Sequence, residues 1–134
     1  IYGDECLLFC CHMLSFRFND NPIILFLGDS ITEGGAATCE ENIYSSVCCQ
    51  ILGATRVSYG LGGTRIAEQR HTYKDYVNSD QSFFQRAQKM QDEADIVVVF
   101  GGINDFGHGD APLGNKNDTS IYTFYGALNN LYSY

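Results

Sequence analysis

Three short glycine-rich segments carry the side chains that could do chemistry in this sequence. The first, Gly28–Gly34, contains Ser30; the second is Gly60–Gly63; the third, Gly102–Asp105, contains Asn104. A serine hydroxyl can act as a nucleophile, a glycine lets a backbone N–H approach an oxyanion, and a side-chain amide is another neutral donor. One such donor contributes roughly 2.7 to 4 kcal/mol to transition-state stabilisation. These residue types therefore predict acyl transfer.

Each segment follows a predicted β-strand. Residues 23–27 and 96–100 are continuously apolar, as is typical of parallel strands covered on both faces, and residues 55–59 form the strand between them in sequence. A helix with an apolar stripe is predicted from Glu40 to Gly53, with the stripe facing the core, and this spacing implies a right-handed parallel crossover. Because the carboxyl ends of parallel strands meet at one edge, the three glycine-rich segments should converge.

The remaining chain supplies further helices and loops. Helices are predicted over 81–93 and from a cap at 118–120 to Tyr132, with a loop at 69–80 and a long loop at 106–117. A length of 134 residues suits one domain with a real core. We therefore expect an α/β domain over residues 22–134 and an N-terminal extension of unclear role over residues 1–21.

Composition excludes several classes of partner. The net charge of −8 and the pI of about 4.6 argue against nucleic acid and anionic membranes. No apolar run approaches membrane-spanning length and no signal-peptide pattern is present, which favours a cytoplasmic protein. The six cysteines lack zinc-site spacing and include two adjacent pairs, so reduced thiols are favoured over disulfides. Neither a metal nor a cofactor is expected.

The same segments carry a family resemblance. Gly-Asp-Ser-Ile-Thr-Glu-Gly at 28–34, Gly-Leu-Gly-Gly at 60–63 and Gly-Ile-Asn-Asp at 102–105 resemble, in order and spacing, the first three blocks of the SGNH/GDSL hydrolases. The resemblance implies a flavodoxin-like three-layer α/β/α fold with a parallel sheet, serine esterase activity and small acyl-ester substrates, including O-acylated carbohydrates. It also implies that Ser30 is the nucleophile and an N–H donor, while Gly63 gives a backbone N–H and Asn104 a side-chain amide to the oxyanion hole.

The family's last block, an Asp-x-x-His that follows two further strands, is not found in these residues, because the single Asp-x-x-His string, Asp105–His108, overlaps the third block. The three histidines are His12, His71 and His108, and His108 is the candidate substitute because it follows Asn104 closely in a glycine-rich stretch. Three explanations compete: a fragment of a longer enzyme, a site completed by a second chain, or a pseudo-enzyme that keeps the pocket.

We favour a fragment truncated before that block, because a three-stranded sheet would leave an apolar edge that soluble proteins normally protect. An exposed or intermolecularly paired edge is therefore predicted at the strand 96–100, and self-association through it would follow.

Other functions and plainer roles remain open. Ser30 could be a helix cap, Gly63 could merely need positive φ, and Asn104-Asp105 could form an Asx turn. The runner-up function is a non-catalytic module that binds a small ligand or a carbohydrate. A flavodoxin-type nucleotide binder is disfavoured because no Gly-x-Gly-x-x-Gly or P-loop follows the first strand, and the Gly-x-Ser-x-Gly elbow of α/β-hydrolases is also absent.

Overall fold

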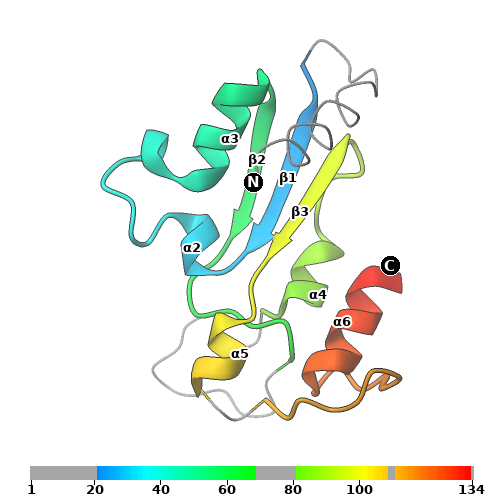
Figure 1. The fold of residues 1–134 in the computed structure, drawn as a ribbon. Coiled ribbons are helices and arrows are strands. Elements are labelled where there is room, and N and C mark those ends of the chain that lie inside the picture. The colour runs from blue at the N-terminus through cyan, green and yellow to red at the C-terminus, as the bar shows by residue number, and fades with distance from the viewer. Residues whose placement is uncertain (1–20, 69–80, 109–110, 134) are drawn as a thin grey trace, which may run out of the picture.

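A computed structural model describes residues 21–68, 81–108 and 111–133 of the protein. The predictions for residues 1–20 and for the loop 69–80, including His12 and His71, lie outside the described residues. Three parallel strands form the sheet in the order β2-β1-β3 (Figure 1). They are β1 (Ile23–Gly28), β2 (Thr55–Gly60) and β3 (Ile96–Phe100). The predicted parallel α/β fold is confirmed.

The register aligns the carboxyl ends of the strands. Gly28 of β1 pairs with Gly60 of β2 on one side and with Phe100 of β3 on the other. At the opposite end, Asp95 clamps the start of the sheet, because its carboxylate accepts the Ile23 N–H and its own N–H donates to the Ile23 carbonyl. The glycine-rich segments therefore leave the sheet at one edge, as the sequence predicted.

The central strand β1 supplies both hydrophobic cores. Its residues Ile24 to Leu27 are all buried, which fits a strand without alternation. On one face, Ile24 and Phe26 pack with Cys49 of α3 (Tyr44–Leu52). On the other, Leu27 belongs to a cluster with residues of α4 (Phe83–Ala87) and α6 (Phe124–Ser133). Helices thus cover both faces in three layers (Figure 1).

Strand β3 is an edge strand of the sheet. Within the described ranges it pairs only with β1, and Val97 and Phe100 are 53% and 47% exposed. Its apolar edge carries no proline and no charged residue to prevent pairing with another chain. This confirms an exposed edge at the third strand; association through it stays a prediction.

The predicted helix at 40–53 ends at Gly53 in the left-handed region, as expected, but differs at its start. A short 3-10 turn, η1 (Glu40–Asn42), is separated from α3 by Ile43 in an extended conformation. Within the continuous helix α3, Ser45 and Cys49 face inward, where Ser45 Oγ accepts from Arg56 Nε, while Ile51 is 77% exposed. The expectation that the whole apolar stripe is core-facing was therefore wrong.

Other boundaries also differ from expectation. Helix α4 is shorter than the helix predicted over 81–93. The first residues of the loop predicted over 106–117 belong instead to the helix α5 (Ile103–His108). Helix α6 starts at Phe124 because Thr123 caps it: its hydroxyl accepts the Gly126 N–H, and Asp118 accepts from that hydroxyl.

Two further findings concern the cysteine thiols and the lengths of the helices. The described cysteines, Cys39, Cys48 and Cys49, are free thiols. Of the helices in the described ranges, none combines the length and the apolar character needed to cross a membrane.

Candidate active site

Ser30 is the first residue of the short helix α2 (Ser30–Glu33), directly after β1. Asp29 caps this helix, because its Oδ1 accepts the Ile31 N–H at 3.0 Å. Gly34, in the left-handed region, ends it. Interpreting Ser30 as the cap was therefore wrong, because Asp29 holds that position. Within the described part of the chain, no hydrogen bond engages the Ser30 hydroxyl, which is half-buried.

The glycine loop after β2 lies against this turn because its residues lack side chains. An ideal Cβ at Gly60 would lie 2.5 Å from the carbonyl carbon of Thr32, closer than any real contact. At Gly62 it would lie 3.7 Å from the Ser30 Cβ, and the Gly62 N–H donates to Glu33 Oε2 at 2.9 Å. The second segment is thus brought beside Ser30.

Gly63 itself has a φ of 75°, in the left-handed region that favours glycine. The plainer interpretation of Gly63 as a conformational requirement therefore applies to it. A positive φ does not prevent the Gly63 N–H from donating to an oxyanion, because the amide hydrogen is present whatever the value of φ. Its role as an oxyanion donor stays a prediction.

Asn104 and Asp105 tie the third segment to the second. Asn104 Nδ2 donates to the Thr64 carbonyl at 2.8 Å. The carboxylate of Asp105, which is 5% exposed, accepts the Ile66 and Ala67 N–H groups at 3.0 and 2.8 Å. These long-range bonds rule out the alternative that the Asn-Asp pair is a local Asx turn. Helix α5 instead presents both side chains to the loop after Gly63.

Arg86 of α4 is a residue of this region that the sequence interpretation missed. Its guanidinium donates to the Gly28 carbonyl at 3.0 Å, to Thr64 Oγ1 at 2.9 Å, to the Tyr59 carbonyl and, through Nε, to the Gln81 carbonyl at 3.2 Å. The only signal in the sequence was an arginine three residues after Phe83, on the buried side of the predicted helix.

Burial lowers the pKa of Arg86 to about 10, while the charges of Asp29 and Glu33 oppose this shift. The side chain therefore stays protonated at neutral pH.

His108, the candidate substitute base, is the exposed last residue of α5. It follows Asn104 by one helical turn, so the two lie on the same side of that helix. Among the described residues, no group of three His, Cys, Asp or Glu side chains could hold a metal ion.

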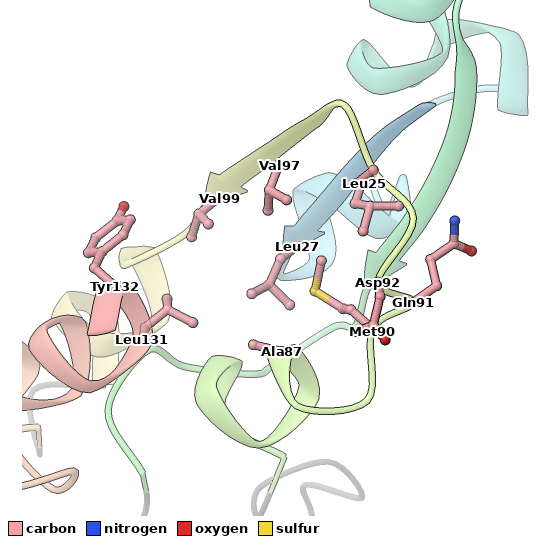
Figure 2. A pocket seen from close by; sticks show the side chains of 11 residues that line it. Leu25, Leu27, Ala87, Met90, Gln91, Asp92, Val97, Val99, Leu131 and Tyr132 are labelled. Atoms are coloured by element: carbon pink, nitrogen blue, oxygen red, sulfur yellow. The ribbon is translucent and has the colours of Figure 1, made fainter. Parts of the chain in front are cut away.

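Ser30 lines neither of two apolar pockets. The first, about 490 Å³, lies on the sheet face beside the β3 edge (Figure 2) and is lined by Leu25, Leu27, Val97 and Val99 of the sheet and by Ala87, Met90, Gln91, Asp92, Ala94, Leu131 and Tyr132. Neither Gly63 nor Asn104 lines it. The second, about 500 Å³, adjoins the third glycine-rich segment and is lined by Gly102, Asp105, Phe106, Ala111, Leu113 and Phe124. Pocket size therefore does not identify the predicted site.

Comparisons with known proteins bear on the family. The sequence matches the GDSL-like Lipase/Acylhydrolase family over residues 26–132. A crystal structure of a protein from Lactobacillus plantarum is 33% identical with a TM-score of 0.66, covering 87% of this chain and 50% of that one. Another solved structure is also 33% identical, with a TM-score of 0.69, covering 85% and 50%.

This chain thus spans about half the length of the solved structures that it matches. A search of curated proteins gives no match. The family match extends over most of the chain and contains all three glycine-rich segments, with Ser30 at the end of β1 and Asn104 at the start of α5. The chain belongs to the GDSL-like lipase/acylhydrolase family.

Proposed function

We propose that this chain carries the nucleophile and the oxyanion donors of a carboxylic ester hydrolase. The Ser30 hydroxyl attacks the ester carbonyl carbon, and N–H groups of Ser30, Gly63 and the Asn104 side chain donate to the resulting oxyanion. A general base takes the Ser30 hydroxyl proton during the attack and gives it to the alcohol oxygen as the bond to that oxygen breaks. The same base then takes a proton from water, whose oxygen attacks the acyl carbonyl, and returns it to Ser30 Oγ as the acid leaves. The observation that carries this proposal is the strand register, which starts all three turns at one edge of the sheet.

Asn104 can serve both structure and chemistry. A side-chain amide has two N–H donors, and one of them donates to the Thr64 carbonyl. The other is available for an oxyanion. Because the bond to Thr64 fixes the amide plane, the second donor has a defined direction, which favours preorganised stabilisation of developing charge.

The proposed general base is a histidine outside these 134 residues, since the single Asp-x-x-His string, Asp105–His108, overlaps the third block and its Asp105 carboxylate accepts the Ile66 and Ala67 N–H groups. His108 is the alternative within the chain. In serine hydrolases, loss of the base lowers the turnover number about 10⁶-fold, and the remaining rate is about 10³ to 10⁴ times that of the uncatalysed reaction. We therefore expect only slow hydrolysis of small acyl esters, including O-acylated carbohydrates, by these residues alone.

The experiment that tests the proposal is prolonged labelling with excess fluorophosphonate, whose phosphorus Ser30 attacks only slowly when the base is missing. We expect one adduct on Ser30, mapped by mass spectrometry, that disappears in Ser30→Ala. Ser58→Ala is the matched control, because Ser58 is an exposed serine of β2 whose hydroxyl accepts the Gly60 N–H. An unlabelled parent protein, or an adduct retained in Ser30→Ala, would contradict a nucleophilic Ser30.

A second candidate function is a non-catalytic module that binds a small oxyanion or a sugar at the same edge. The lack of a separate Asp-x-x-His block after the third block favours it, because a site without a base can still bind. Titration with acetate, followed through the amide resonances of Gly63 and Asn104, separates the two. Saturable shifts in a protein that is inert to the fluorophosphonate would support the module over the esterase.

A further inference from the structure

Arg86 joins segments of the chain that are far apart in sequence. Nη2 donates to the Gly28 carbonyl at 3.0 Å and to Thr64 Oγ1 at 2.9 Å, and Nη1 donates to the Tyr59 carbonyl. One acceptor precedes the first glycine-rich turn, and the other two flank the second. Gly28 ends β1, Tyr59 is the penultimate residue of β2, and the Thr64 carbonyl accepts from Asn104.

We propose that Arg86 is a positioning residue that fixes the serine turn, the glycine loop and Asn104 relative to one another. The inference rests on the proposed function, since their relative position matters for catalysis only if they act on one substrate atom. A displacement of about 1 Å can lower an enzymatic rate about 10²-fold. A single rigid group bonded to the first two turns, and linked to Asn104 through Thr64, would limit such displacements.

The chemistry of the site favours geometry over stability as the reason for an arginine. Its side chain is 7% exposed, and its hydrogen bonds end on carbonyl and hydroxyl oxygens rather than on a carboxylate. An apolar residue of similar volume often gives equal or greater stability at a buried charged position.

An apolar side chain cannot, however, supply five N–H donors in a planar fork. Lysine keeps the charge but has donors on one atom only. It could not reach the Gly28, Tyr59 and Thr64 acceptors in their present directions, so an Arg→Lys change isolates the contribution of the fork.

The first test compares Arg86→Lys with Arg56→Lys. Arg56 is a matched control because it also donates through Nε and Nη1, to Ser45 and Glu40, but pairs with Ile24 near the opposite end of the strands. We expect fluorophosphonate labelling of Ser30 to slow about 10²-fold in Arg86→Lys and to stay near the parent rate in Arg56→Lys. Equal labelling rates in Arg86→Lys and the parent would overturn the proposal.

A second measurement does not depend on reactivity. Hydrogen exchange of the Gly62, Gly63 and Thr64 amides should accelerate in Arg86→Lys, while exchange in α3 stays at the parent rate. Unchanged exchange in the loop would overturn the positioning role. If the parent is not labelled, the proposed function fails, and the exchange comparison still decides whether Arg86 fixes the loop.

A pair of variants at the acceptor covers the case in which Arg86→Lys does not fold. Thr64→Val keeps the shape but removes the hydroxyl that accepts from Arg86 and donates to the Leu61 carbonyl, whereas Thr64→Ser keeps the hydroxyl. We expect faster loop exchange in Thr64→Val and near-parent exchange in Thr64→Ser. Parent-like exchange in both would overturn the proposal.

Discussion

Replacing Gly60 with alanine should separate the glycine loop from α2. An ideal Cβ at this position would clash with the Glu33 nitrogen and would lie 2.5 Å from the Thr32 carbonyl carbon and 2.7 Å from the Glu33 Cα, whereas ordinary contact begins at 3.4 Å. The loop and the helix must therefore move apart by at least about 0.9 Å. All three clashing atoms belong to the backbone, so no side-chain rotation can relieve the contact. The displacement reaches Ser30, two residues before Thr32 in the same helix.

This displacement should affect stability and reactivity together. Overpacking of this kind destabilises proteins by about 1 to 3 kcal/mol, and a shift near 1 Å lowers rates about 10²-fold. Urea unfolding measures the first effect, and the rate of fluorophosphonate labelling at Ser30 measures the second. Both losses are expected in Gly60→Ala.

Gly107→Ala is the matched control. Gly107 lies in α5, with no atom within 4 Å of an added Cβ and no positive φ. Alanine should therefore stabilise this helix by about 0.5 to 1 kcal/mol and leave labelling unchanged. The reasoning would be refuted by a Gly60→Ala protein with parent stability and labelling, or by equal losses in both variants.

Three further predictions concern other parts of the molecule. Asn104→Ala should slow labelling of Ser30 by about 10²- to 10³-fold. Asn130→Ala should not slow it, although it removes a side-chain amide of α6 that donates to the Thr119 and Gly126 carbonyls. Burial raises the pKa of Tyr44, whose hydroxyl shares a hydrogen bond with Thr32. The full contribution of Tyr44 to the free energy of unfolding is therefore present below the pKa of the unfolded chain, near 10, and is lost as the pH rises through the raised pKa of the folded protein. The fall in this free energy at alkaline pH, measured by urea unfolding, should be shallower in Tyr44→Phe. Val97→Lys should abolish self-association measured by sedimentation, because a lysine on the β3 edge opposes strand pairing; a parent that is monomeric at high concentration would contradict the interface.

The strands could be predicted because their signal is local. Residues 23–27 and 96–100 are uninterrupted apolar runs bounded by glycine or polar residues, and the observed β1 and β3 agree with them within one residue. Their parallel order followed from the helix that connects β1 to β2. The convergence of the glycine-rich turns was then a geometric consequence of parallel strands.

What sequence reasoning missed depends on long-range contacts. A glycine-rich stretch such as 101–109 has low helix propensity, yet α5 forms where Asp105 accepts two N–H groups from residues 66 and 67. The role of Arg86 depends on acceptors in β1, β2 and the loop between β2 and α4, which its neighbours in sequence do not reveal. The inward face of α3 was misjudged because a small polar residue, Ser45, is buried there and accepts from Arg56 of β2, while the apolar Ile51 is exposed.

The central place of β1 also sets an order of assembly during synthesis. Its partner β2 begins at Thr55, but its other partner, β3, begins only at Ile96. When β2 has just left the ribosome, the nascent chain can form only β1 and β2, and one edge of β1 is unpaired. The α4 and α6 residues of the cluster around Leu27 have not yet been synthesised. Ser30 and the glycine loop can therefore meet early, whereas Asn104 arrives with the last third of the chain. Chaperone contact with the nascent protein should be greatest in that interval, when Ile24 to Leu27 have been made but not yet enclosed.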